Sequence, residues 1–144
     1  MRAVLQRVSK ASVRAGSYRE SIGPGILALV AVKNTDTEKD SELIAEKTVN
    51  LRIFPDTGGK LNRSVLDLKG EVLAVSQFTL YGDCRKGRRP GFSDCAGREE
   101  GRLLFDLYVQ KLNDKGVSVK TGVFGEDMKV SLVNDGPVTL IVES

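Results

Sequence analysis

The sequence predicts an α+β fold, with a curved, mainly antiparallel sheet or open β-barrel on which two main helices pack. Segments with strand-like patterns outnumber helical ones, and only 37–51 and 98–115 carry a long helical pattern. The chain has 144 residues, which is the size of one typical domain. No internal repeat, linker or low-complexity segment divides it. We therefore expect residues 1–144 to form a single domain.

Extended segments dominate the start of the chain. Residues 2–14 alternate weakly between apolar and polar side chains, which predicts a strand, and we expect a bulge near Ser9 and Lys10. A short strand around Ile22 follows, between turn-rich segments. Residues 26–32 form a continuous apolar run, which is typical of a central strand that is buried on both faces.

The first helix is predicted to begin at Thr37, because acidic residues in its first turn suit the positive end of a helix dipole. Apolar residues at helical spacing up to Leu51 give this helix one face for packing on a sheet. A short strand at 52–55, a loop at 56–60 and a helical turn within 62–67 are expected next.

The second half of the chain contains the longest predicted helix. A buried strand at 71–78 leads into a long polar loop at 83–97, and the helix at 98–115 follows with leucines on one face. Gly116 stands where a helix-ending glycine belongs. The remaining segments are expected to be strands at 117–121, 129–133 and 138–143, with a loop at 122–127.

The composition indicates an ordinary globular protein. Hydrophobic residues make up 40% of the chain and 15 residues are glycine, which is a normal proportion. No apolar run approaches the ~20 residues that a membrane-spanning helix needs, and Arg2 and Arg7 lie in what would be a signal peptide. We expect a soluble, cytoplasmic protein without membrane contact. The net charge of +3 permits contact with a polyanion but does not require it.

The sequence contains no histidine, which restricts the chemistry open to it. Ser-His-Asp and Cys-His catalytic sites, histidine bases and histidine-ligated metals are all excluded. Cys84 and Cys95 lack metal-ligand spacing, and we expect them to be structural or incidental thiols rather than a redox pair. Any reaction must use hydroxyls, carboxylates, lysines, backbone dipoles or the substrate itself. We expect no metal and no organic cofactor.

Near the C-terminus, two apolar runs are separated by Asn134-Asp135-Gly136-Pro137. Proline cannot donate to a sheet ladder, so it belongs at an edge, a strand start or a bulge. Gly136 permits close approach of a ligand, and Pro137 restricts the backbone. On this stretch alone, an ordinary hairpin turn and a rigid turn that directs carbonyl groups at a ligand both fit. A cis Gly136-Pro137 bond is also open to an X–Pro sequence.

A second stretch, Ser76-Gln77-Phe78-Thr79, ends the predicted strand at 71–78 with a cluster of polar side chains. The segments SQFTL at 76–80 and NDGPVT at 134–139 resemble the two signature motifs of the D-aminoacyl-tRNA deacylases, first described as D-tyrosyl-tRNA deacylases. Other segments that resemble the family, in family order, are MRAVLQRVSKASV at the start, NLRIFPDTGGKLN at 50–62, RRPGF at 88–92 and FGEDM at 124–128. The resemblance covers essentially the whole chain.

The resemblance implies a homodimeric hydrolase with each active site beside the subunit interface. Its substrate would be the ester between the 3′ end of tRNA and a D-amino acid, or glycine mischarged on tRNA-Ala. The catalytic residues would be Ser76, Gln77, Phe78 and Thr79. The amides of the last three could stabilise an oxyanion, as preorganised backbone donors do in acyl transfer. The alternative is that Ser76 and Thr79 satisfy a turn while Phe78 fills the core.

The resemblance also implies a role for Gly136 and Pro137, inserted from the partner subunit. Their carbonyls would hold the α-amino group, and an L side chain would collide with backbone, whatever its chemical identity. Asn134 is expected to orient this turn through side-chain hydrogen bonds. Met128 belongs either to the core or to the pocket for the terminal adenosine, and Thr139 is as well explained by a strand as by a contact.

Thr79 carries a hydroxyl that could attack an ester, but a nucleophile needs an adjacent base and no histidine is available. We expect instead that the 2′-hydroxyl of the terminal ribose assists attack by water, so that Thr79 is not acylated. A covalent hydrolase of another ester, with Thr79 as nucleophile, is the rival hypothesis.

One dense basic run stands out in the loop after the SQFTL segment. It is either a solvated loop or a contact for phosphates of the tRNA acceptor stem, which would set affinity without reading sequence. A non-catalytic nucleic-acid-binding protein is therefore another rival hypothesis. Arg7 and Lys60 could add charge near the site or lie on the surface. The basic run comprises Arg85, Lys86, Arg88 and Arg89.

Overall fold

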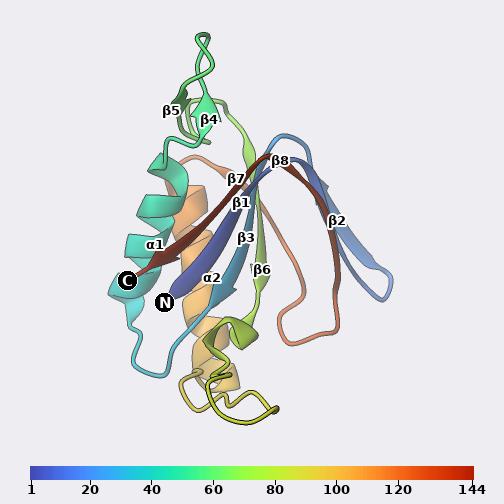
Figure 1. Cartoon of the computed structure of the whole chain (residues 1–144), viewed down its shortest axis with the longest axis vertical. Helices are drawn as coiled ribbons and strands as arrows, with labels where there is room; N and C mark the ends of the chain where they lie inside the picture. Colours follow the sequence, from blue (N-terminus) through green and yellow to red (C-terminus); the bar gives the residue numbers. More distant parts are fainter.

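Strand β1 (Arg2–Ala15) is the centre of the sheet in the computed structural model, which describes all residues from 1 to 144. The first half of β1 pairs antiparallel with β3 (Gly25–Ala31), and its second half pairs antiparallel with β2 (Tyr18–Ile22). On its other side, β1 pairs with β8 (Lys129–Glu143) along nearly its whole length. These long strands bend together, so the sheet curves (Figure 1).

The other side of the sheet is parallel. Strand β6 (Glu71–Ser76) pairs with β3, and β7 (Ser118–Thr121) pairs with β6. These pairings need crossover connections, which the two long helices provide. The expected α+β fold with a curved, mainly antiparallel sheet and two main helices is confirmed, with the parallel pairs confined to this side.

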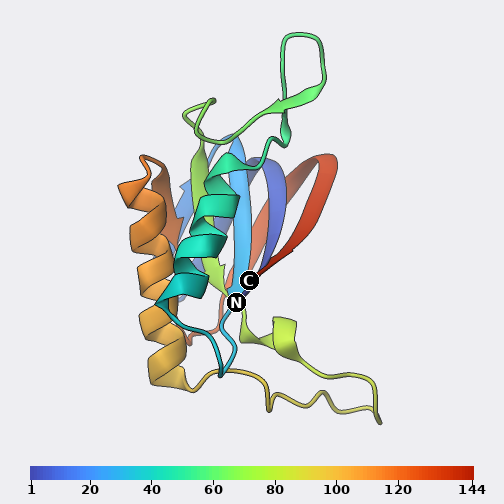
Figure 2. The ribbon, with the colours of Figure 1, turned by 90° about the vertical axis from the view of Figure 1, so that its left-hand side faces the viewer.

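Helices α1 (Glu38–Asn50) and α2 (Arg98–Asp114) cover the same face of the sheet (Figure 2). Helix α1 begins as predicted, because the Asp40 carboxylate accepts a hydrogen bond from the Thr37 N–H at 2.7 Å and so satisfies a free backbone donor. Gly116 follows α2 with φ +90°, a conformation that glycine adopts without steric cost. No helix combines the length and the apolar character required to cross a membrane.

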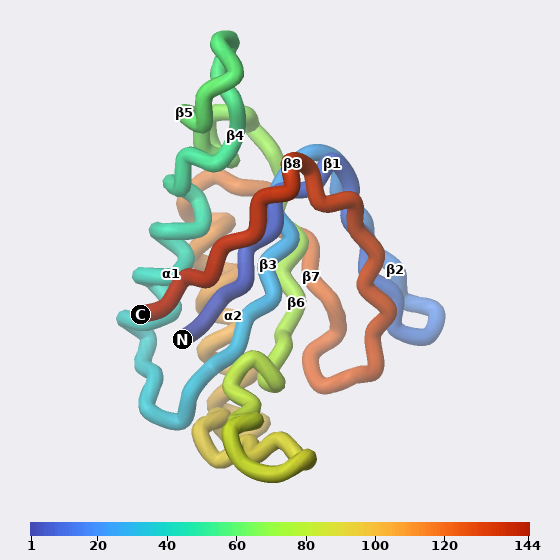
Figure 3. Tube along the Cα trace, viewed as in Figure 1, coloured from blue at the N-terminus to red at the C-terminus, as the bar shows by residue number.

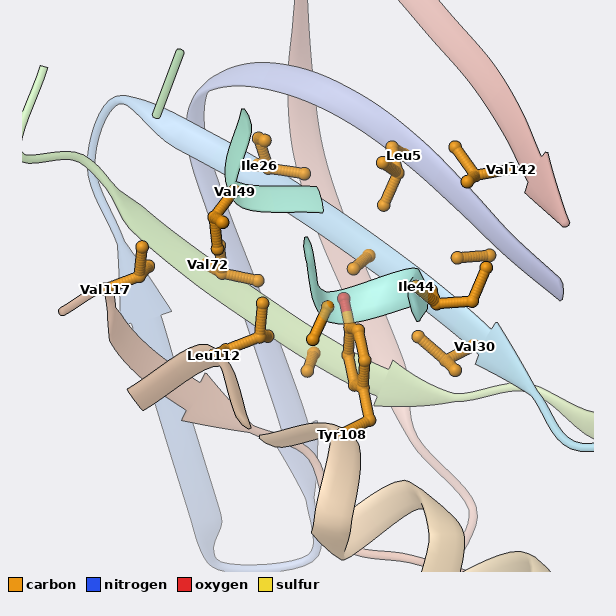
Figure 4. Packing of buried hydrophobic residues seen from close by; sticks show 14 of the residues in the cluster. Leu5, Ile26, Val30, Ile44, Val49, Val72, Tyr108, Leu112, Val117 and Val142 are labelled. Carbon is orange, nitrogen blue, oxygen red and sulfur yellow. The ribbon is translucent and has the colours of Figure 1, made fainter. Parts of the chain in front are cut away.

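The main core lies between the sheet and the two helices (Figure 4). Tyr108 of α2 is fully buried there, and its hydroxyl shares a 3.1 Å hydrogen bond with the Thr48 hydroxyl of α1. A second, smaller cluster includes Val8, Leu27 and Val75 and lies on the other face of the sheet, because successive side chains of a strand point to opposite faces. Because β3 and β6 contribute side chains to both clusters, their sequences are continuous apolar runs.

Smaller elements complete the chain. Strands β4 (Phe54–Pro55) and β5 (Leu61–Arg63) form a separate hairpin, so the strand at 52–55 is shorter than predicted and the expected helical turn within 62–67 is replaced at its start by β5. The predicted strand at 71–78 ends at Ser76 and is followed by a 3-10 helix, η1 (Phe78–Tyr81). The two predicted C-terminal strands form the single strand β8.

Candidate active site

The segment 135–138, here called the Gly-Pro bulge, interrupts β8 without reversing it. Gln6 of β1 aligns with Thr139 and Val8 aligns with Asn134, so four residues of β8 face the single residue Arg7. The interpretation of this stretch as a hairpin turn is therefore wrong, because β8 pairs with the same strand in the same direction on both sides of the bulge. The Gly136-Pro137 peptide bond is cis.

Arg7 supports the Gly-Pro bulge from inside the protein. Its guanidinium donates to the Asp135 carbonyl at 2.9 Å and to the Ile53 carbonyl at 2.7 Å, and its side chain is almost completely buried. A Cβ atom at position 136 would lie 2.5 Å from Arg7 Nη2, and Gly136 has φ +125°. Only glycine fits both requirements. Of the two interpretations of Arg7, the surface one is wrong.

Asn134 closes the bulge with its own side chain. Its Oδ1 accepts a hydrogen bond from the Val138 N–H at 3.1 Å, and its Nδ2 donates to the Thr139 hydroxyl at 2.9 Å. The Gln6 amide also reaches that hydroxyl, at 3.2 Å. The side-chain hydrogen bonds expected of Asn134 are thus present. Because hydrogen bonds fix the residues on both sides of Gly136 and Pro137, the exposed backbone of these two residues is held in one conformation.

Residues 76–79, here called the SQFT corner, lie where β6 ends and η1 begins. The Gln77 N–H already donates to the Val30 carbonyl of β3 at 2.7 Å, so the expectation of three free amides is wrong for this residue. Phe78 and Thr79 open η1, and the first N–H groups of a helical turn have no acceptor within it. The oxyanion donors available at this corner therefore reduce to the amides of Phe78 and Thr79.

The side chains of the SQFT corner face outward. Phe78 is 54% exposed, so the alternative in which it fills the core is wrong. The Gln77 side-chain amide donates to the Thr79 hydroxyl. An amide nitrogen that donates in this way cannot accept a proton from that hydroxyl, so the corner supplies Thr79 with no general base.

A cavity of about 540 Å³ opens beside the SQFT corner. Met128 lines it and also packs against the smaller core cluster, so the residue is both part of the packing and part of the cavity wall, and its contact with a terminal adenosine stays a prediction. The cavity combines aromatic walls with charged groups at α2 and at the loop before β8, which suits a ligand with a flat apolar part and polar edges. Residues that line it include Ser76, Gln77, Phe78, Arg98, Phe124 and Met128.

Within one chain, the SQFT corner and the Gly-Pro bulge do not meet. Along β3, Ser76 aligns with Val30, whereas Arg7 aligns with Ile26 at the other end of the strand. Four residues at about 3.3 Å each, combined with three strand spacings of about 4.8 Å, separate the two sites by roughly 20 Å. Figure 3 shows the corner at one end of the molecule and the bend of β8 at the other. No residue of the bulge lines the cavity.

The basic run lies in the loop that follows η1. Arg85 is paired within the loop, because its guanidinium contacts both Asp83 carboxylate oxygens at 2.8 and 2.9 Å and holds the pKa of Asp83 at about 2. The other three cations, Lys86, Arg88 and Arg89, are exposed and form no ion pair. The loop touches the SQFT corner through Phe92, whose ring lies 5.2 Å from that of Phe78. Lys60 lies on the surface of a different loop.

Both cysteines are free, and Cys95 lies beside the corner, where its thiol contacts the Phe78 carbonyl at 3.4 Å. Burial raises the pKa of the Cys95 thiol. No three Cys, Asp or Glu side chains gather in a way that could hold a metal ion. Two further residues near the corner, Arg2 and Arg98, have no predicted role at the site, because an arginine at a strand start or helix start carries no local functional signal.

Comparisons with known proteins show which family the chain resembles. The family model described as D-Tyr-tRNA(Tyr) deacylase matches residues 4–143. The D-aminoacyl-tRNA deacylases of Bacillus mycoides (strain KBAB4) and Bacillus cereus (strain B4264) are each 56% identical over 145 residues, covering 100% of this chain and 99% of the relative. These proteins resemble the present chain from end to end.

Two solved structures have a similar fold. The structure titled c-Myc DNA Unwinding Element Binding Protein has a TM-score of 0.94 at 39% identity and covers 100% of this chain and 99% of its own. A structure of a probable eukaryotic D-amino acid tRNA deacylase has a TM-score of 0.84 at 16% identity, with 99% and 98% covered, and so supports the fold alone. With its family model matched over nearly every residue and full-length relatives at 56% identity, the chain belongs to the D-Tyr-tRNA(Tyr) deacylase family.

Proposed function

We propose that this chain is a D-aminoacyl-tRNA deacylase, a hydrolase that cleaves the ester bond between a D-amino acid and the 3′ end of tRNA. The observation that carries the proposal is the position of the SQFT corner on the wall of the cavity. The terminal adenosine would occupy the cavity between aromatic walls and Met128. The scissile carbonyl would then lie at the mouth, where the Phe78 and Thr79 amides can stabilise its oxyanion.

Water would be activated by the substrate rather than by the protein. Thr79 accepts a hydrogen bond from the Gln77 amide, and the chain has no histidine. The 2′-hydroxyl of the terminal ribose is adjacent to the ester and can assist proton transfer from the attacking water. A tRNA that ends in 2′-deoxyadenosine should therefore be hydrolysed about 10²-fold or more slowly, which is the usual contribution of positioned proton transfer.

The Gly-Pro bulge would discriminate between mirror forms from a second copy of the chain. Because the two sites lie roughly 20 Å apart within one chain, we infer that they can act on the same ester only if one of them comes from a partner. Strand β8 offers a surface for that partner, because one of its edges pairs with β1 while its other edge is unpaired, and Ile141 and Val133 on it are 70% and 45% exposed. A homodimer would then place each bulge at its partner's cavity.

In that arrangement, the carbonyl groups of Gly136 and Pro137 hold the α-amino group of the substrate. An L side chain collides with rigid backbone, whereas a D side chain or the hydrogen of glycine does not. Glycine mischarged on tRNA-Ala would therefore also be hydrolysed. The exposed cations Lys86, Arg88 and Arg89 would contact acceptor-stem phosphates. With a tRNA substrate of this kind, we propose that the protein works in the cytoplasm.

Matched D- and L-tyrosyl-tRNA, offered to the purified full chain, test the proposal. We expect free amino acid to accumulate from the D form alone, and the Pro137→Ala variant to lose activity or discrimination. Equal hydrolysis of both forms would contradict the stereochemical role of the bulge. RNA binding that depends on salt, without any release of amino acid, would support the rival non-catalytic binding protein instead.

A further inference from the structure

The 3-10 helix η1 carries the two proposed oxyanion donors but has little of its own to hold it in place. It is a single turn, none of its residues is buried, and Phe78 is more than half exposed. Its internal hydrogen bonds run from Leu80 to Gln77 at 3.2 Å and from the following Gly82 to Thr79 at 2.9 Å. Such short 3-10 turns have weak hydrogen-bond geometry, so the orientation of η1 must depend on contacts from outside.

Arg2 supplies such contacts from the first residue of β1. Its Nη1 donates to the Leu80 carbonyl at 2.7 Å, and its guanidinium carbon lies 4.7 Å from the centre of the Tyr81 ring, a cation–π distance. These two contacts hold the C-terminal end of η1. The Gln77 N–H, bonded to Val30, holds the N-terminal end.

The Arg2 side chain is itself fixed by the sheet. Its Nε donates to the Glu143 carboxylate at 2.5 Å, and Arg2 aligns with Glu143 on β8 and with Ala31 on β3. A planar guanidinium holds its N–H donors in a fixed fork and can stack flat on a ring, whereas a lysine ammonium is a compact charge on a flexible stem. Arg2 therefore links a rigid three-stranded part of the sheet to a turn that has no anchor in the core.

We propose that Arg2 is a positioning residue for deacylation, which holds η1 so that the Phe78 and Thr79 amides point to the oxyanion. This inference rests on the proposed function of the SQFT corner. Arg2 lines no part of the cavity and so acts through η1 rather than by touching the substrate. Preorganised donors lose much of their effect when they are displaced by a fraction of an ångström.

The surroundings of Arg2 argue against a mainly structural role. The side chains of Arg2 and Glu143 are 34% and 52% exposed, and ion pairs at such positions contribute little to stability. Removing the guanidinium should therefore leave the fold intact while it frees η1. The expected signature is a loss of catalytic rate without a comparable loss of folding stability or of tRNA affinity.

Single-turnover hydrolysis of D-tyrosyl-tRNA by the full chain provides the first test. Arg2→Ala should lower the rate at saturating enzyme by about tenfold or more, as loss of one aligned oxyanion donor does. The enzyme concentration at half-maximal rate should stay within about twofold of wild type, since Arg2 is outside the cavity. Arg2→Lys should recover part of the rate because its ammonium can still donate to the Leu80 carbonyl. Arg102→Ala, which removes an exposed ion pair with Asp106 on α2, is the matched control and should change nothing.

Hydrogen exchange provides a second test that does not depend on activity. In Arg2→Ala, the segment 77–82 should exchange faster, while the segment 71–75 of β6 should exchange at the wild-type rate. Failure of wild type to hydrolyse D-tyrosyl-tRNA would refute the proposed function, and the exchange data alone would then decide whether Arg2 anchors η1. Any one of four results would overturn the proposal. Three of them are unchanged exchange in the segment 77–82, a wild-type rate in Arg2→Ala, and a change in the half-saturating enzyme concentration alone. The fourth is a loss of rate that accompanies a lower urea midpoint of unfolding and is not recovered in Arg2→Lys.

Discussion

The Gly-Pro bulge and the SQFT corner are supported in different ways. The bulge is held from inside by the buried Arg7 guanidinium and across its base by the Asn134 side chain. The corner is an exposed turn at the end of β6 that is joined to the sheet by the Gln77 N–H and by a surface arginine. The way in which each segment is supported matches the task proposed for it. Rejection of an enantiomer by collision fails if the backbone yields, so the bulge is held from several sides, whereas at the corner a few contacts have to keep two backbone amides in position.

This difference predicts that small changes at the bulge cost more than small changes at the corner. Gly136→Ala should have the largest effect, because the new Cβ would meet Arg7 Nη2 at 2.5 Å and φ is +125°. Backbone strain of about 1–3 kcal/mol and displacement of Arg7 should together lower D-tyrosyl-tRNA hydrolysis by about 100-fold. Rates with D- and L-tyrosyl-tRNA measure the effect.

Gly23→Ala is the matched control, since a Cβ at Gly23 meets nothing within 4 Å. It should retain wild-type activity and stability. If Gly136→Ala retained the activity and stability expected of Gly23→Ala, the backbone of the bulge would be able to move to accept the new Cβ. The proposed discrimination by a rigid backbone would then have no physical basis.

Arg7→Lys should have the next largest effect. Lysine keeps the charge, but its single ammonium cannot reproduce the guanidinium geometry that joins the Asp135 and Ile53 carbonyls. Loss of one charged hydrogen bond should lower the free energy of unfolding by about 1.5–3 kcal/mol. The ratio of D to L hydrolysis should fall with it, by about tenfold. Urea unfolding and paired hydrolysis assays measure the two effects.

Arg14→Lys on the same strand is the control, because Arg14 is exposed and has no ion pair. It should match wild type in both assays. If Arg7→Lys were less stable than wild type but kept the full preference for D-tyrosyl-tRNA, discrimination would not depend on the stability of the bulge. That result would weaken the proposed link between the support of the bulge and its role.

A smaller effect is expected from the basic loop, which lies beside the corner and far from the bulge. The triple variant Lys86→Ala, Arg88→Ala and Arg89→Ala should lower tRNA affinity uniformly and reduce the slope of log affinity against log salt by about 2–3. Arg85→Ala should change this slope less, because Arg85 is already paired with Asp83. Binding measured at several salt concentrations distinguishes the two variants, and an unchanged slope in the triple variant would leave the run as a solvated loop.

The sequence predicted features that depend on local chemistry. The first turn of α1, the apolar runs of β3 and β6, and the glycine after α2 all follow from residues close together in the chain. For Gly136 the sequence suggested close approach of a ligand, but it did not indicate the cause for which the structure requires glycine there. That cause is an arginine 129 positions earlier, which becomes relevant only when β1 and β8 pair.

The predictions from sequence are wrong where pairing with a distant strand determines the local structure. Two apolar runs around turn residues fit a hairpin and a bulged strand equally well, and only pairing of both runs with β1 selects the bulge. In the same way, the Gln77 amide looked free because its acceptor, the Val30 carbonyl, belongs to a strand that is 47 residues away and pairs in parallel. Local pattern cannot show which long-range acceptor a backbone donor will find.

Thr79→Ala should have the smallest effect, although the hydroxyl lies at the proposed catalytic centre. Its hydroxyl accepts from the Gln77 amide and has no base beside it, whereas the proposed catalytic group is its backbone N–H, which alanine retains. Hydrolysis of D-tyrosyl-tRNA should fall by less than about tenfold, or about 1.4 kcal/mol in barrier height. Acid-quenched mass spectrometry of wild type should detect no aminoacyl adduct. A folded but inactive Thr79→Ala, or an adduct on Thr79, would instead make the hydroxyl a nucleophile. Catalysis at the SQFT corner would then depend on the exact position of the Thr79 side chain, just as discrimination at the Gly-Pro bulge depends on the position of its backbone.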